Sequence, residues 1–168
     1  MKFEEAKQEF IQSWGVLGTQ WGINRTMAQI HALLLIAPDA LCADDVMEQL
    51  QISRGNANMN LRELIDWKLV NKVLKPGERK EFFQAEKDIW KVAMCIVQER
   101  KKKEFDPLLK TVTDLKEIED GGASKESAEF LETMLSIERF ALKGDKALTG
   151  LVAASDNWFT GTLLKLFK

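Results

Sequence analysis

The sequence predicts a mainly α-helical protein that carries one small β-hairpin. Apolar residues recur at helical spacing along most of the chain, whereas β-forming residues gather in one stretch on either side of a proline–glycine turn. The chain has 168 residues, of which 45% are hydrophobic and 30% charged. This length and composition suit a globular protein that buries a core, as one domain or as a small domain with a helical arm.

Two helices are expected at the N-terminus. A stripe of aromatic residues and leucine from Phe3 to Trp21 predicts the first, which ends near Gly22. We expect this stripe to pack in the core or in a dimer. The second helix is expected over residues 26–37, after a cap at Asn24 or Thr26 and before Pro38.

A short helix, a tight turn and a further helix follow. The short helix is expected over 43–50, with aspartates in its first turn, where the helix dipole favours acids. After a two-residue turn, Ser53 has the chemistry to cap a helix that runs from Arg54 to about Trp67. The inward positions of that helix are Ala57, Leu61, Leu64 and Ile65.

The hairpin is expected immediately afterwards. Residues 69–74 and 80–85 are its strands, and Lys75-Pro76-Gly77-Glu78 places proline and glycine at the two central positions of a type II turn. Beyond it, helical spacing predicts one long helix over 87–120, with Asp106-Pro107 as a kink or a new start. Gly121-Gly122 marks a break, and helices are expected over 125–143 and, after a second break at Gly144, to about Phe167.

Helix, turn, helix and hairpin in this order predict a winged helix-turn-helix. We expect this domain over residues 24–86. The remaining helices, in 1–23 and 87–168, carry long apolar stripes that a small winged domain leaves uncovered. They are therefore expected to form a helical dimerisation region.

The outward face of the helix that starts at Arg54 is rich in polar residues. Three asparagines within five residues and one glycine lower helix stability, glycine by roughly 1 kcal/mol. Asparagine can contact adenine in two places, arginine can do the same at guanine, and glycine permits close approach of the backbone. This composition favours a helix that reads the DNA major groove. Its outward positions are Arg54, Gly55, Asn58, Met59 and Arg62, flanked by Asn56 and Asn60.

Local charge points the same way. The chain carries a net charge of −2, but residues 53–80 hold seven bases and three acids, a net +4. Three of these bases lie at the tip of the hairpin, where they are expected to contact phosphates or the minor groove. They are Lys75, Arg79 and Lys80.

Residues 52–90 resemble the MarR superfamily of winged-helix regulators, and more closely its GbsR-type branch. The similarity rests on SRGNANMNLREL, followed by LV and then PGERKEFF, and extends more weakly upstream through 22–50 and downstream to about Leu109. The resemblance implies a homodimer and a transcriptional regulator, in particular a repressor, with its recognition helix at 54–66. Two positions depart from the family pattern. Lys68 stands where a glycine is usual and must adopt a left-handed conformation or change the helix cap, and Cys42 stands near a usual serine or threonine cap.

The sequence thus predicts a sequence-specific double-stranded DNA-binding protein. The alternative is a winged-helix adaptor that binds protein, which the overall acidity would suit. A small-molecule effector is a further possible partner, since aromatic side chains can form a cage for a cation. The expected DNA-contacting residues are Ser53, Arg54, Gly55, Asn56, Asn58, Asn60, Arg62, Lys75, Arg79 and Lys80. The candidate effector residues are Trp14, Trp21, Trp90, Trp158 and Phe159.

Other classes find little support in the sequence. The chain has a single histidine, His31, and two distant cysteines, Cys42 and Cys95, so neither a zinc site nor a disulfide framework is expected. Motifs for nucleophilic catalysis, phosphate loops or dinucleotide binding are missing, so we expect neither an enzyme nor a cofactor. No segment is apolar enough to span a membrane, and the free thiols suit a cytoplasmic protein.

Overall fold

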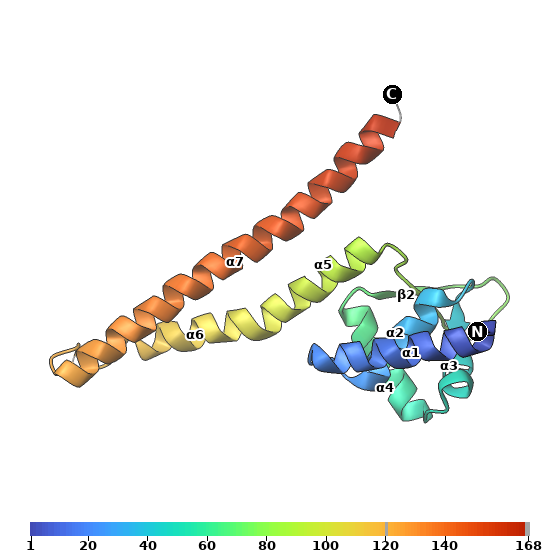
Figure 1. Ribbon diagram of the computed structural model, residues 1–168, viewed down its shortest axis with the longest axis horizontal. Coiled ribbons are helices and arrows are strands. Elements are labelled where there is room, and N and C mark those ends of the chain that lie inside the picture. Colours follow the sequence, from blue (N-terminus) through green and yellow to red (C-terminus); the bar gives the residue numbers. More distant parts are fainter. Residues whose placement is uncertain (120, 167–168) are drawn as a thin grey trace. The chain divides into compact units, whose positions relative to one another are not determined.

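A computed structural model describes the backbone of residues 1–119 and 121–166, and side chains as far as residue 154 (Figure 1). Its contacts divide the chain into two compact units, 1–92 and 93–168. The first unit contains four helices and three strands among the described residues. They are α1 (Phe3–Gln20), α2 (Arg25–Ile36), β1 (Leu41–Cys42), α3 (Ala43–Leu50), α4 (Arg54–Asp66), β2 (Val70–Val73) and β3 (Phe82–Ala85).

This order confirms the predicted winged helix-turn-helix. The helices α3 and α4 pack on each other and on α2, and the β2–β3 hairpin follows α4 directly. Glycine provides the turn between the two strands. Gly77 has a φ of 83°, and the Glu78 amide donates to the Lys75 carbonyl at 3.1 Å, as a type II turn requires.

The expectation that the hairpin holds the only strands is wrong. The two residues of β1 pair antiparallel with β3, so the sheet has three strands in the order β1-β3-β2. Leu41 lies opposite Phe83, and Cys42 lies opposite Phe82. A two-residue strand is too short to leave a periodic pattern in the sequence.

Helix α1 packs on α2 through a narrow face. Its buried residues are Ile11, Gly15 and Gly18, and a Cβ added at Gly18 would lie 2.5 Å from the Cβ of Ala28. Only the middle of the aromatic stripe reaches this core. Trp14 is half-buried and contacts His31 of α2, whereas Phe3 and Trp21 keep 78% and 50% of their surface exposed. Because Gly15 and Gly18 lack side chains, α2 packs on the face of α1 where they lie. The aromatic residues lie at the side of this contact.

The C-terminal end of α4 shows how the chain accommodates Lys68. This lysine adopts a φ of 59°, and the amides of Lys68 and Leu69 donate to the carbonyls of Ile65 and Leu64. A left-handed residue followed by these two bonds is the helix ending that usually contains glycine. Of the two expected alternatives, a left-handed lysine and a changed cap, the structure shows the left-handed lysine.

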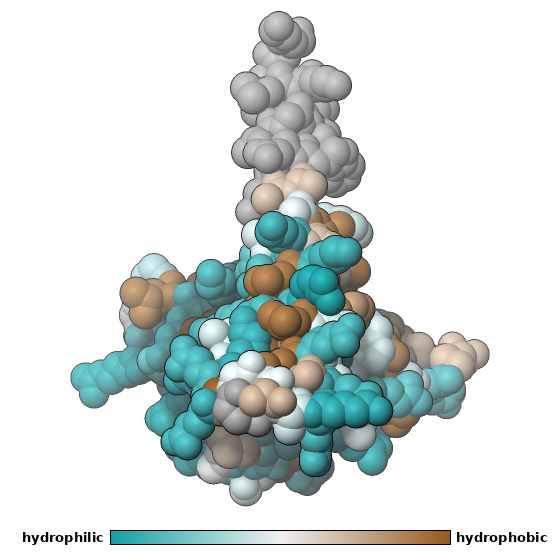
Figure 2. Space-filling view, turned by 90° about the vertical axis from the view of Figure 1, so that its left-hand side faces the viewer, coloured by the Kyte–Doolittle hydropathy of each residue, from teal (hydrophilic) through white to brown (hydrophobic). Residues whose placement is uncertain are grey.

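Helix α5 (Ile89–Arg100) leads from the first unit into the second. A π-helical turn, η1 (Lys101–Phe105), separates α5 from α6 (Asp106–Leu115). Helix α7 (Lys125–Leu166) packs against η1 and α6. Of the kink and the new start expected at Asp106-Pro107, a capped new start is not observed, because the backbone stays helical from Arg100 through Asp106 and no side chain caps α6. Figure 2 shows apolar side chains among hydrophilic ones on the surface of α7.

The predicted break at Gly144 is wrong, because α7 runs through it without interruption. A Cβ at this position would lie 2.9 Å from Cε1 of Phe105. Gly144 therefore lets the Phe105 ring approach the helix instead of ending it. No helix among the described residues has the length and apolar content needed to cross a membrane.

Candidate nucleic-acid interface

Helix α4 begins at a defined cap and presents a polar face. The Ser53 hydroxyl accepts a hydrogen bond from the Asn56 amide at 3.3 Å, which satisfies one of the free amides of the first turn. Opposite the core face, Arg54, Gly55 and Arg62 are exposed, and Asn56 and Asn58 are half-buried. A cap at Ser53 and an arginine at each end of the exposed face agree with the predicted recognition helix.

Met59 adds an apolar group to this face. Its side chain is 58% exposed, although it lies in the middle of α4. An exposed apolar side chain at this point matches the thymine methyl group, which is the one apolar feature of the major groove.

Asn60 is not on this surface, so its expected contact with DNA is replaced by another role. The side chain is only 1% exposed, and its amide nitrogen donates to the carbonyl oxygen of Asn56 at 2.8 Å and to Asn56 Oδ1 at 2.6 Å. Asn60 therefore orients the side chain of Asn56 from beneath. Helical periodicity predicts Asn60 at the border between the buried and the exposed face, where a small rotation of the helix about its axis decides whether a side chain is buried.

The basic side chains of the wing differ in their exposure and in their contacts within the protein. Arg79 is exposed at the tip. Lys75 is half-buried, with its ammonium donating to the Ala40 carbonyl at 3.1 Å and lying 4.1 Å from the centre of the Phe82 ring. Lys75 therefore ties the wing to the residue before β1, and its charge is partly engaged within the protein.

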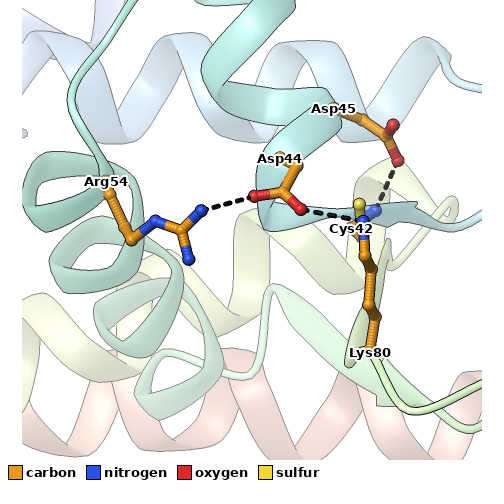
Figure 3. A network of polar contacts seen from close by, with 5 residues as sticks. All are labelled: Cys42, Asp44, Asp45, Arg54 and Lys80. Atoms are coloured by element: carbon orange, nitrogen blue, oxygen red, sulfur yellow. Dashed lines mark hydrogen bonds and ion pairs between the residues drawn. The ribbon is translucent and has the colours of Figure 1, made fainter.

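Asp44, in the first turn of α3, links α4 to the wing. Its two carboxylate oxygens lie 2.9 Å from Arg54 Nη2 and 2.9 Å from Lys80 Nζ (Figure 3). The hydrogen bond and the charge of Lys80 hold the pKa of Asp44 below its usual range, and the same hydrogen bond raises the pKa of Lys80. Asp44 and Lys80 are therefore both charged at neutral pH.

Sequence reasoning missed this network, because it assigned Asp44 only to the helix dipole. Asp44 is 10 residues from Arg54 and 36 from Lys80, so no local pattern connects them. A second acid, Glu81, pairs with Lys72 at 2.7 Å. Both acids lower the positive charge of a surface whose bases lie at 53–80.

The candidate effector residues do not form one described cluster. Trp14 donates from Nε1 to His31 Nδ1 at 3.3 Å, and its ring lies 5.4 Å from that of Phe10. Trp21 and Trp90 are 50% and 46% exposed. Trp158 and Phe159 fall outside the residues whose side chains are described.

Comparison with known proteins agrees with this geometry. No protein-family model matches the chain. A curated relative, the "HTH-type transcriptional repressor GbsR" of Bacillus subtilis (strain 168), is 30% identical over 88 residues, which are 52% of this chain. The chain thus spans about half the length of the curated relative that it matches, 48% of it.

One solved structure, described as "Crystal Structure of a transcriptional regulator", has a similar fold: it superposes with a TM-score of 0.68 at 14% identity, covering 90% of this chain and 99% of that one. A DNA-bound mutant of S. aureus MepR reaches a TM-score of 0.42 at 16% identity, covering 80% and 94%. The chain has a winged helix-turn-helix fold and, as its residues 52–90 indicated, its sequence is similar to a GbsR-type protein.

Proposed function

We propose that this protein is a sequence-specific double-stranded DNA-binding transcriptional regulator that acts as a repressor. The observation that carries the proposal is the outward face of α4, which Arg54, Asn58, Met59 and Arg62 share with the exposed Gly55. Two arginines, an amide and a thioether on one face supply the donors and the apolar contact that base edges in the major groove and the nearby phosphates require. The name of the Bacillus relative supports the same function.

The wing supplies the sequence-independent part of the contact. Arg79 and Lys80 are exposed near its tip, where they reach the phosphate backbone or the minor groove. We further propose that the protein acts as a homodimer, so that two copies of α4 enter successive major grooves about 34 Å apart and read a pseudo-palindromic site.

Selection from a random duplex library tests the proposal directly. Fluorescence anisotropy then compares the selected duplex with a scrambled one at several salt concentrations. A specific regulator binds its selected site at least about 10³-fold more tightly than the scrambled duplex. Capture of a protein partner, together with no duplex binding even at low salt, would contradict DNA reading and favour the adaptor.

Two exposed arginines separate base reading from backbone contact. Arg62→Ala on α4 is expected to weaken binding to the selected site by about 1–3 kcal/mol and to relax its sequence preference. Arg79→Ala on the wing is expected to weaken both duplexes alike and to reduce the salt slope by about 1. Equal losses on both duplexes for Arg62→Ala would remove Arg62 from the base-reading set.

A further inference from the structure

Asp44 stands between the two elements that we expect to contact DNA. It accepts hydrogen bonds at 2.9 Å from Arg54, the first residue of α4, and at 2.9 Å from Lys80, which precedes β3. Figure 3 shows the two basic side chains reaching the carboxylate from opposite sides. One carboxylate is thus paired with two basic side chains of the proposed interface.

The network contributes little to the fold itself. The side chains of Arg54, Lys80 and Asp44 are 71%, 58% and 45% exposed, and ion pairs in contact with water stabilise proteins only slightly. Nor does α3 depend on Asp44 for its start, because Asp45 Oδ2 accepts the Cys42 amide at 2.8 Å. The arrangement therefore calls for an explanation other than stability.

The chemistry of the two donors provides one. A guanidinium and an ammonium that converge on a carboxylate form the charge-assisted bonds that they also form with phosphate. We propose that Asp44 is an internal competitor for DNA phosphate: its carboxylate neutralises Arg54 and Lys80 in the free protein and so lowers the affinity for every duplex. This inference rests on the proposed DNA-binding function.

The competition has two consequences. When DNA takes the two bases, the negative charge of Asp44 is left beside the phosphates, so the complex is weakened whatever its sequence. Because the freed carboxylate attracts a cation from solution when its two bases turn to the phosphates, the net number of cations released on binding is smaller than the number of phosphate contacts, and the salt dependence is shallow.

Asp44→Asn tests the proposal, since asparagine keeps the size of the side chain and removes its charge. The full chain is compared with the variant by anisotropy on the selected and the scrambled duplex between 50 and 200 mM salt. We expect about three- to thirtyfold tighter binding of both duplexes at the lowest salt, because two exposed pairs are released. The slope of log affinity against log salt should steepen by about 1, because the variant has no carboxylate that takes up a cation when the two bases turn to the DNA.

Glu48→Gln is the matched control. It removes one negative charge from the exposed surface of the same helix, and Glu48 belongs to no ion pair among the described residues. A change of less than about twofold is expected there. When Arg54 and Lys80 are both replaced by glutamine, Asp44→Asn should change affinity no more than Glu48→Gln does.

The outcomes separate the inference from the function on which it rests. If the wild-type chain binds no duplex, both are overturned. If the wild-type chain binds its selected site but Asp44→Asn binds equally or more weakly, only the competitor is overturned. Weaker binding would then mean that Asp44 holds Arg54 and Lys80 in place for DNA. Unchanged thermal unfolding of the variants shows that the differences arise at the interface.

Discussion

At the scale of single residues, His31 is an ionisable group in the core whose protonation state is determined by burial. Its ring is 3% exposed, and Nδ1 accepts the hydrogen bond of Trp14. Burial, with a smaller contribution from the charge of Lys87, lowers the pKa of His31 from 6.5 to about 4. The fold therefore holds the neutral imidazole, and the bond from Trp14 fixes the proton on Nε2, which has no partner among the described residues.

A pH dependence follows from this shift. Because the pKa is lower in the folded protein, the unfolded chain binds more protons between about pH 4 and 6.5, and stability falls as the pH falls through this range. Between pH 7 and pH 5 the free energy of unfolding should fall by about 2 kcal/mol on account of His31 alone. Urea unfolding of the wild type and of His31→Gln at pH 7 and pH 5 isolates the contribution of His31 to this change, since glutamine does not titrate. Equal losses in the two proteins would show that His31 is already charged in the fold.

At the scale of elements, the C-terminus of α4 is strained at one residue. Lys68 holds a φ of 59°, which costs an L-residue with a Cβ roughly 1 kcal/mol. Lys68→Gly should therefore raise the free energy of unfolding by up to about 1 kcal/mol, as measured by urea unfolding. Lys68→Ala is the control, because it removes the long side chain but keeps the Cβ. Equal stabilisation by both substitutions would mean that the lysine side chain, and not the backbone, is the source of the strain.

Two helical glycines are expected to respond to alanine in opposite ways. At Gly18 the new Cβ would lie 2.5 Å from that of Ala28, so α1 has to move away from α2. At Gly55 the new Cβ would meet nothing within 4 Å. Thermal unfolding should show Gly18→Ala destabilised by about 1–3 kcal/mol and Gly55→Ala stabilised by about 0.5–1 kcal/mol.

The same Gly55→Ala variant tests the proposed interface. If α4 lies close to DNA at this point, the added methyl group should weaken binding to the selected duplex while the fold becomes more stable. Gain of stability without loss of DNA affinity would show that the backbone at Gly55 does not approach the duplex. A stability gain at the expense of function is the behaviour expected at a ligand-facing position.

How far the sequence predicts these elements depends on the distance between interacting residues. The cap at Ser53, the turn at Gly77 and the left-handed Lys68 are each determined within four residues, and all three were anticipated. The strand β1 and the uninterrupted course of α7 at Gly144 depend on partners far along the chain, and both were missed. The site divides in the same way. The exposed face of α4 follows from helical periodicity, whereas the engagement of its arginine by Asp44 depends on the tertiary fold.

At the scale of the whole molecule, the second unit leaves large apolar side chains in water. On α7, Phe140 is 73% exposed, and Leu135 and Leu142, two helical turns apart, are 45% and 44% exposed. The proposed dimer would bury these groups, and burial of a phenylalanine side chain contributes about 1.5–3 kcal/mol. Sedimentation of the wild-type chain at micromolar concentration is expected to give twice the 19.1 kDa mass of one copy.

Phe140→Asp should shift that equilibrium towards the monomer, because association would have to bury a carboxylate. Leu74→Asp is the matched control: Leu74 is 89% exposed but lies on the wing, which the proposed dimer leaves free for DNA. Sedimentation across a dilution series should show a weaker dimer for the first variant and an unchanged one for the second. A wild-type chain that sediments as a monomer contradicts the dimer outright. Equal weakening by both variants would place the interface elsewhere than on α7.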